Sequence, residues 1–366
     1  MRRPFKTRGA AAILAAGIGA AVLGVAAPAY AASHTVHPGE SIQAAIDAAQ
    51  PGDSIKVRAG TYHENLYVSK DNIELEGAGA GQTILLPPDV ATPSPCVSPD
   101  DGSIFGAVCV GLSDDPVEGF ELEGFTIEGF ANGAFLVNTV KAEVENNVFA
   151  NNEEYGAFYN DSTGGNFHDN VAYGSHEAGL YFGDAENADV KIDDNEVYDN
   201  AFGILIRDAA NGRVRDNYAH DNGFGIFLLN VDAPFEATGW KVRDNRVVHN
   251  SAVFHLDEGG PQGFDVSGGG IVLAGASDND IRENDVRDNT PSGPSSLGSG
   301  GIALFDATPL GGTPSSNNLI RRNQLEGNEP YDINDQGGGT GNTFRRNDCD
   351  TSQPPGLCGN GDGDDD

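Results

Sequence analysis

The stretch Asn195–Asp208, NEVYDNAFGILIRD, recurs in degraded form along most of the chain. Each copy has an asparagine, an apolar residue two positions later, and a second Asn or Ser three positions after that. A glycine then opens an alternating apolar run. The leading positions are Gly124, Asn146, Asn170, Asn195, Asn217, Asn245, Asn284, Asn323 and Asn347. Their spacing of 22 to 39 residues predicts a solenoid in which each copy forms one coil.

The type of coil follows from the side-chain pattern within one copy. Runs such as Val190–Ile192 and Ile204–Ile206 alternate with the period of half-buried strands. Three strands per copy predict a triangular coil that pairs in parallel with its neighbours. We expect the leading asparagine at the tightest corner, in a left-handed conformation and bonded to the asparagines above and below. A leucine-rich repeat would need more leucine and a helical side. We therefore predict an all-β, parallel β-helix, a three-sheet solenoid of about ten coils.

The N-terminus has the pattern of a secretory signal. Residues 1–31 contain basic residues at Arg2, Arg3, Lys6 and Arg8, then an Ala-rich apolar core that ends in Ala29-Tyr30-Ala31. This pattern predicts a signal peptide cleaved after Ala31, and a secreted, extracellular product without a membrane anchor. Either general secretion or twin-arginine export fits it. A formal net charge of −34 argues against nucleic acid or an anionic membrane as a partner.

Four cysteines remain in a chain that is expected to be secreted. An even number in this setting predicts disulfides, and sequence proximity favours Cys96 with Cys109 and Cys349 with Cys358. Each bond would contribute about 3 kcal/mol in the loop-entropy model. A zinc site is the weaker alternative, because the chain has no Cys-x-x-Cys spacing.

A short amphipathic helix precedes the first coil. Residues 41–49 place Ile42, Ala45 and Ile46 on one helical face, and Pro51-Gly52 ends the helix. We expect it to cap the open strand edges of the first coil. The stretch Pro38–Asn65, PGESIQAAIDAAQPGDSIKVRAGTYHEN, resembles the N-terminal cap and first coil of pectin-lyase-like right-handed parallel β-helix proteins, a superfamily that includes NosD-type periplasmic proteins. The repeats resemble its generic coil, which implies a right-handed β-helix domain over residues 32–358.

Several segments interrupt the repeat. Residues 86–116 are rich in Pro, Ser, Asp and Gly and predict a long loop with one strand near Ala107–Val110. Insertions at 251–269 and 290–300 would lie on the side of the third strand of each coil. The acidic, Gly-rich segment 359–366 predicts a disordered tail. No separate domain boundary is visible.

In the superfamily that the chain resembles, the strand after the asparagine turns builds the substrate cleft. Here these strands begin at Gly133, Gly156, Gly179, Gly203, Gly225, Gly270 and Gly301. If the second residue after each glycine points outward, the outer set is Phe135, Phe158, Tyr181, Leu205, Phe227, Val272 and Ala303. The aromatic members Phe135, Phe158, Tyr181 and Phe227 would form a substrate-binding stripe. The alternatives are a protein-contact patch and a face covered by loops.

The same register aligns charged residues. Glu154 and Glu177 occupy one position in adjacent coils, with His176 beside Glu177. Another position holds Asp161, Asp184 and Asp208 in successive coils, and Arg207 precedes the last of them. The aspartates either bond backbone amides in Asx turns or bind calcium, which needs six to eight oxygens at about 2.3–2.6 Å.

These residues suggest two kinds of chemistry. Hydrolysis of a glycosidic bond needs two carboxylates, for which Glu154 and Glu177 are the candidates. Elimination from a uronate needs a cation and a base, and calcium on the aspartates with Arg207 or His176 would resemble the calcium-dependent lyases of this fold. The alternative is a non-catalytic extracellular binding or structural protein. A NosD-like copper accessory fits poorly, because Cu(I) prefers thiolate and thioether ligands. We expect a monomer whose partner is a polysaccharide, and leave its status as an enzyme open.

Overall fold

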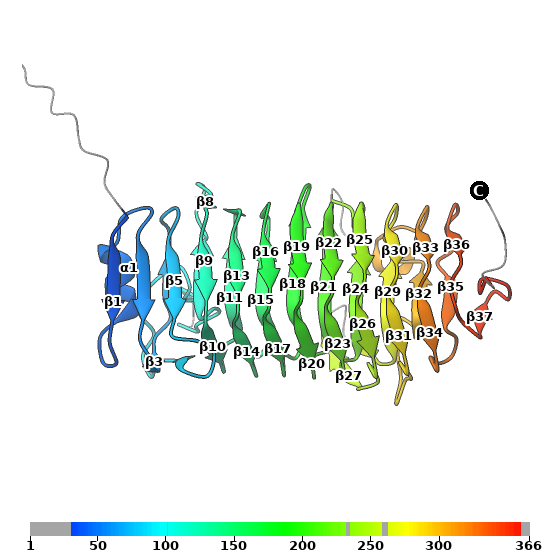
Figure 1. The fold of residues 1–366 in the computed structure, drawn as a ribbon, viewed down its shortest axis with the longest axis horizontal. Coiled ribbons are helices and arrows are strands. Elements are labelled where there is room, and N and C mark those ends of the chain that lie inside the picture. Colours follow the sequence, from blue (N-terminus) through cyan, green and yellow to red (C-terminus); the bar gives the residue numbers. More distant parts are fainter. Residues whose placement is uncertain (1–30, 101, 232–234, 258–262, 360–366) are drawn as a thin grey trace, which may run out of the picture. The chain divides into compact units, whose positions relative to one another are not determined.

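The computed structural model describes residues 31–100, 102–231, 235–257 and 263–359, which form one solenoid of stacked β-coils (Figure 1). All but the last residue of the expected signal peptide, and all but the first residue of the expected tail, lie outside the described residues. Three long parallel sheets of 12, 10 and 11 strands run along the solenoid, close to the ten coils expected. Among the described residues, no helix has the length and apolar composition needed to cross a membrane.

Each coil contributes one strand to each sheet. Sheet A contains, in order, β1 (Ser33–Val36), β2 (Ser54–Val57), β5 (Glu74–Gly77), β9 (Glu121–Glu123), β13 (Glu143–Glu145), β16 (Asn166–His168), β19 (Val190–Asp193), β22 (Gly212–Arg215), β25 (Trp240–Arg243), β30 (Asp280–Arg282), β33 (Leu319–Arg321) and β36 (Thr343–Arg345). Sheet B contains β3 (Gly60–His63), β6 (Thr83–Leu86), β10 (Phe125–Glu128), β14 (Val148–Ala150), β17 (Val171–Tyr173), β20 (Glu196–Tyr198), β23 (Tyr218–His220), β26 (Arg246–Val248), β31 (Asp285–Arg287) and β34 (Gln324–Glu326). Sheet C contains β4 (Leu66–Val68), β7 (Val108–Gly111), β11 (Asn132–Val137), β15 (Tyr155–Asn160), β18 (Ala178–Ala185), β21 (Phe202–Ala209), β24 (Phe224–Leu229), β29 (Gly269–Ala274), β32 (Gly300–Phe305), β35 (Ile333–Gln336) and β37 (Ser352–Gln353).

The asparagine ladder between sheets A and B is confirmed. The backbone amide and side-chain Nδ2 of Asn195 both donate to Oδ1 of Asn217, at 2.9 and 3.0 Å. The same pattern joins Asn170 to Asn195 and Asn217 to Asn245. These side chains are buried, so their mutual bonds satisfy polar groups that have no access to water. A second ladder, through Asn200, Asn222, Asn250, Asn289 and Asn328, follows the corner between sheets B and C.

Two details of the expected ladder are wrong. The buried ladder member in its coil is Asn147, whose backbone amide donates to Asn170 Oδ1, whereas Asn146 is exposed. The left-handed residue at this corner is the one before the ladder asparagine, such as Asp194 with φ 56° and Asp216 with φ 55°. That residue makes the turn, and the asparagine after it can then point its side chain into the interior.

The glycine that opens each sheet C strand is required by the closeness of the coils. A Cβ atom on Gly156 would collide with the carbonyl oxygen of Gly179 in the next coil, and one on Gly203 would collide with that of Gly225. Any other residue would push the coils apart at this corner. This explains why the repeat keeps glycine here.

The N-terminal helix is α1 (Ile42–Ala48), with Ser41 as its N-cap. Its buried residues Ile42 and Ile46 pack on the first coil. β4 ends sheet C and so lacks a neighbour on one side. The side chain of Gln43 accepts from the amide of Tyr67 in this strand at 2.8 Å and donates to its carbonyl at 3.2 Å. The helix therefore supplies hydrogen bonds that a further strand would otherwise make.

The interruptions of the repeat form loops, not separate domains. The 251–269 insertion contains an antiparallel hairpin of β27 (Phe254–Leu256) and β28 (Phe264–Val266). Two short strands, β8 (Val117–Glu118) and β12 (Thr139–Val140), pair beside the coils, and a 3-10 helix, η1, covers Thr308–Leu310. The structure pairs the four cysteines as expected, Cys96 with Cys109 and Cys349 with Cys358.

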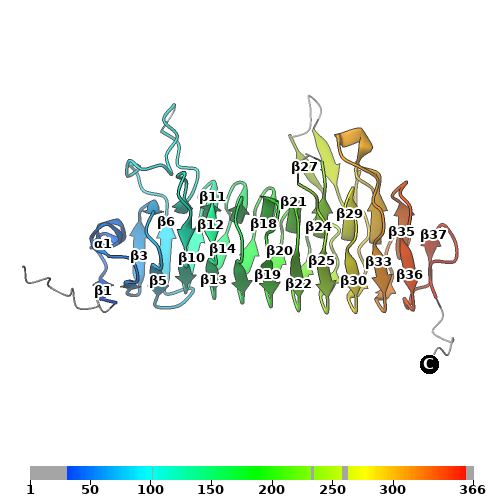
Figure 2. The same ribbon diagram turned by 90° about the horizontal axis from the view of Figure 1, so that it is seen from above.

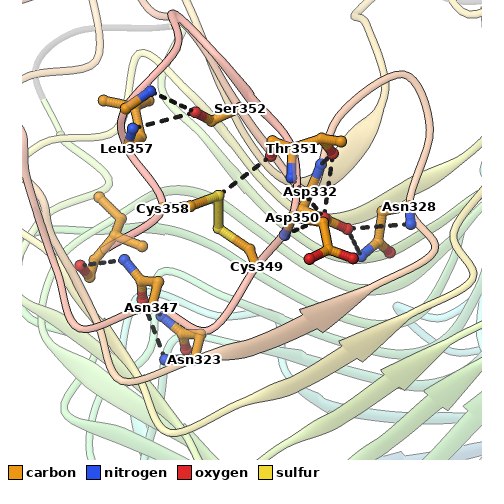
Figure 3. Close-up of a disulfide and its surroundings, with 12 residues drawn as sticks. Asn323, Asn328, Asp332, Asn347, Cys349, Asp350, Thr351, Ser352, Leu357 and Cys358 are labelled. Atoms are coloured by element: carbon orange, nitrogen blue, oxygen red, sulfur yellow. Dashed lines mark hydrogen bonds between the residues drawn. A yellow bond between two sulfur atoms is a disulfide. The ribbon is translucent and has the colours of Figure 1, made fainter. Parts of the chain in front are cut away.

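The C-terminal disulfide lies beside the end of the second asparagine ladder (Figure 3). Asp332 takes the place of a further asparagine: its Oδ1 accepts from Nδ2 of Asn328 at 3.0 Å. Its Oδ2 accepts from the amides of Asp350 and Thr351, both at 3.1 Å. The carboxylate thus ties the last coil to the segment that the Cys349–Cys358 bond closes.

Candidate functional site on sheet C

Sheet C carries the aromatic column that the sequence register predicts. Phe135, Phe158 and Tyr181 occupy equivalent positions in β11, β15 and β18. Their rings stack with centroids 4.6 Å apart at both steps, and the planes differ by 4° and 9°. The expected outer set continues in register through Leu205, Phe227, Val272 and Ala303. The seven positions are therefore aligned from coil to coil, as the sequence predicts.

The column is open at one end and covered at the other. Phe135 and Phe158 are half-buried, whereas Tyr181 and Phe227 are only 3% and 1% exposed. The cover comes from Leu256 and Phe264 of the β27–β28 hairpin and from Leu297 of the 290–300 insertion. Loops thus cover the C-terminal half of the column. Only its N-terminal half, at Phe135 and Phe158, is exposed enough to contact a sugar.

A cavity of about 520 Å³ lies where the open and covered parts meet. Its floor includes Tyr155, Tyr181, Phe202, Leu205 and Phe227, and its roof includes Leu256, Phe264, Leu297 and Leu310. Glu177 and Arg207 supply polar groups to an otherwise apolar wall. Burial raises the pKa of the Tyr181 phenol, and the charge of Asp184 raises it further, so this hydroxyl stays protonated at neutral pH. The cavity can hold one ligand-sized group next to a carboxylate and a guanidinium.

The two candidate catalytic glutamates lie in adjacent coils. The backbone amide of Glu177 donates to the carbonyl of Glu154 at 3.1 Å. Oε2 of Glu154 accepts from Nδ2 of Asn132 at 3.2 Å, and Oε2 of Glu177 accepts from the Tyr155 hydroxyl. Only Glu177 of the pair lines the cavity. Tyr155 was missed in the sequence, although an aromatic residue directly after Glu154 and one position before the strand glycine was a usable signal.

His176 and Arg207 have different surroundings. The amide of His176 donates to the carbonyl of Glu153 at 3.3 Å, and its side chain is exposed outside the cavity lining. Arg207 lines the cavity, and its Nε donates to Oδ2 of Asp208 at 3.3 Å. Arg207 and Glu177 thus line the same cavity at separate places, because Arg207 lies opposite Gly183, six residues after Glu177.

The three aspartates align as expected, but their geometry is that of turns. Asp161, Asp184 and Asp208 all adopt left-handed dihedrals, with φ between 46° and 49°. Asp208 is fully buried and accepts from the amide of Val231 at 2.8 Å, and Asp184 accepts from Nδ2 of Asn160 at 3.0 Å. Within the described residues, their carboxylates are not among the groups that converge closely enough to share one metal ion. Asp208 thus bonds a backbone amide of the next coil, as the alternative without calcium expects, whereas Asp184 bonds a side chain.

The acidic groups that could hold a metal ion lie instead on sheet A. Within the described residues, one group joins Glu143, Glu145 and His168, and another joins Glu121, Glu123 and Glu145. His168 Nε2 lies 3.2 Å from a Glu143 oxygen and 3.3 Å from a Glu145 oxygen, so an ion pair already explains the first group. Neither group lies on sheet C.

Comparison with known proteins agrees with this architecture. Residues 110–264 match the family model described as a right-handed beta helix region. No curated protein sequence matches the chain. The A-module of the mannuronan C-5 epimerase AlgE4 of Azotobacter vinelandii is similar in structure, with a TM-score of 0.62, 18% identity, and coverage of 85% of this chain and 91% of that one. The alginate lyase of Paenibacillus sp. FPU-7 has a TM-score of 0.55, 13% identity, and coverage of 84% and 99%. At these identities the likeness shows the fold alone.

Proposed function

Since the chain has the right-handed parallel β-helix fold of the pectin-lyase-like superfamily, we propose that it binds an extracellular polysaccharide along sheet C. The stack of Phe135, Phe158 and Tyr181 carries this proposal. The rings stack on one another, so the column offers an apolar ridge of ring edges, repeated at one strand spacing, against which the C–H groups of sugar rings can pack. Solved structures of this fold include proteins named as alginate-directed enzymes, which supports the same class of ligand.

Cleavage is the second candidate, and one contact favours it. Glu177 is held by the Tyr155 hydroxyl on the wall of a cavity next to the aromatic column, and Arg207 lines the same cavity. A carboxylate in this position can exchange a proton with a sugar that lies in the cavity beside the column. Glu154, one coil away, would be the second carboxylate of a hydrolase. A protein that only binds its glycan would keep the stack and need neither glutamate.

Calcium at the aspartate column is not part of this proposal. The buried Asp208 carboxylate already accepts backbone and side-chain bonds, and the left-handed turns explain all three aspartates without an ion. A cation that acts in catalysis would have to be held by sheet C, whereas the converging acidic groups of the described residues lie on sheet A. Calcium therefore enters only as a condition to be varied.

The test is a glycan screen with the secreted form of the chain, in the presence of calcium or of a chelator. Binding is measured by the change in intrinsic fluorescence and by calorimetry. Turnover is measured by reducing ends for hydrolysis and by ultraviolet absorbance of unsaturated products for elimination. Binding without products supports the binder, and products support the enzyme. No binding to any acidic or neutral glycan would overturn both.

A further inference from the structure

The outer surface of sheet A changes the sign of its charge along the solenoid. In each strand the central residue, such as Leu122 or Val214, is buried, so its two neighbours point outward. The outward residues of β5, β9 and β13 are all acidic: Glu74, Glu76, Glu121, Glu123, Glu143 and Glu145. Those of β19 to β36 include the cations Lys191, Arg213, Arg215, Lys241, Arg243, Arg282, Arg321 and Arg345, and the anions Asp193 and Asp280. We call this surface the bipolar face.

Contacts within the chain partly neutralise the basic half, because five of its arginines pair with carboxylates of the same chain. Asp193 forms an ion pair with Arg213, and Asp280 forms ion pairs with Arg321 and Arg282. Both aspartates on the strands of the basic half are therefore paired. Arg215 and Arg243 also contact aspartates of the adjoining turns at 2.7 and 2.9 Å. Lys191 and Lys241 are exposed. In the acidic half, Lys56 contacts Glu76, and His168 contacts Glu143 and Glu145.

The order of the strands makes the bipolar face complementary to itself. Sheet A has six strands on each side of the gap between β16 and β19. A two-fold axis through this gap and parallel to the strands places β13 opposite β22, and β9 opposite β25. We propose that a second copy of this chain docks there as an isologous dimer. An axis along the solenoid would instead place each strand opposite its own copy, so that Glu121 would face Glu123 and like charges would meet.

The register assigns opposite charges across the proposed interface. Rotation about an axis parallel to the strands does not shift a residue along its strand. The first outward residue of one strand therefore faces the first outward residue of the opposite strand. Glu121 then faces Lys241, and Glu123 faces Arg243. In the next strands toward the axis, Glu143 faces Arg213 and Glu145 faces Arg215. Farther out the match is mixed, since Glu76 faces Arg282, but Glu74 faces Asp280 and Lys56 faces Arg321. Attraction is therefore concentrated in the central strands.

The available area predicts a weak dimer. Twelve strands about 4.8 Å apart and about three residues wide give roughly 500 Å² per partner, near the lower limit for specific interfaces. Few hydrophobic groups lie on this face, so association depends on charge pairs and weakens with salt. The insertions rise on the opposite side of the solenoid, and sheet C stays accessible in the dimer (Figure 2). The proposed dimer does not depend on glycan binding, and it differs from the monomer expected from the sequence.

A polyanion bound to the basic half is the other occupant to consider. It would leave the six glutamates of the acidic half without a role, and the formal net charge of −34 opposes the approach of any polyanion. A second copy uses both halves at once. The observations therefore favour self-association.

Sedimentation velocity of the secreted chain tests the proposal at low and high salt. The two reversal variants are Glu121→Lys with Glu123→Lys, and Lys241→Glu with Arg243→Glu. We expect the wild type to dimerise at low salt and to dissociate at high salt. Each variant should associate at least about tenfold more weakly alone, whereas an equimolar mixture of the two should form a heterodimer, because each restores the other's missing charge. The four-residue swap in one chain should also recover self-association.

Matched controls separate docking from net charge and from misfolding. Glu186→Lys with Asp257→Lys makes the same charge change at exposed residues outside sheet A and should leave the dimer unchanged. Circular dichroism should show native strand content in every variant. A wild type that stays monomeric at low salt, or a mixture that fails to associate, overturns the proposal. If the wild type instead binds a sulfated glycan, and only the Lys241→Glu/Arg243→Glu variant loses that binding, the face is a polyanion site.

Discussion

The hydroxyl of Tyr155 donates a hydrogen bond to Oε2 of Glu177, 22 residues later in the chain. The bond joins two adjacent coils on the outer face of sheet C, between the aromatic column and the cavity. It fixes the direction of the one candidate glutamate that lines this cavity. The proposals for sheet C depend on this contact and on the stack beside it.

Replacement of Glu177 tests whether the chain is an enzyme. If a glycan is cleaved, Glu177→Gln should abolish turnover and change binding by less than about threefold, because the amide keeps the shape but cannot exchange the proton. Tyr155→Phe should reduce kcat and alter its pH profile, since it removes the hydroxyl that orients the carboxylate. Glu186→Gln, at an exposed residue outside the cavity lining, is the control. Wild-type turnover by Glu177→Gln would remove this residue from the mechanism.

Removal of the central ring of the column tests the binding surface. Phe158→Ala should weaken glycan binding about tenfold, in line with roughly 0.5–1.5 kcal/mol for one aromatic contact. The matched control is Tyr198→Ala, because Tyr198 stacks on Tyr173 at 4.9 Å in sheet B, away from the cavity. Calorimetry with the best glycan of the screen measures both. Equal losses in the two variants would show that stability, not contact with sugar, explains the effect.

The asparagine ladder predicts a contrast between adjacent residues. Asn147→Ala should lower the free energy of unfolding by about 2–4 kcal/mol, because it leaves buried backbone groups of neighbouring coils without partners. Asn146→Gly should change it by less than about 0.5 kcal/mol, since Asn146 is exposed and glycine accepts its positive φ. Urea denaturation compares the two. The reverse ranking would contradict the ladder register.

Glu121 predicts a pH-dependent change in stability. Burial raises its pKa from 4.5 to about 6, and Glu74 and Glu143 add to the shift. The folded state therefore binds the proton more tightly than the unfolded state does. As pH rises from about 4.5 to about 6, the free energy of unfolding falls, because the carboxylate must ionise at a partly buried position. Glu121→Gln should stabilise the monomer by roughly 0.5–1 kcal/mol at pH 7–8, after a discount for partial exposure, and by much less below pH 4.5. Thermal melts at high salt and several pH values measure this difference. A gain that does not depend on pH would rule out the carboxylate charge as its cause.

The sequence by itself determined the coil, its register and the outer residues of sheet C. Side-chain alternation has a period of two, and glycine fixes the start of each sheet C strand, so the position of Phe135 in one coil sets that of Phe158 and Tyr181 in the next. It also located the insertions and the nearest-neighbour cysteine pairs, because both are local breaks in a regular repeat.

Only the tertiary structure decided what covers these residues and which groups meet. Whether Asn146 or Asn147 enters the ladder depends on which of them turns the chain with a positive φ, and the letters alone leave that ambiguous. The contact of Leu256 and Phe264 with the end of the column depends on how an insertion folds back. The bipolar face arises because parallel pairing aligns residues 20 to 47 positions apart in neighbouring strands. A repeat fixes which positions align, but the three-dimensional packing of non-repeating loops and charges decides what the aligned positions contact.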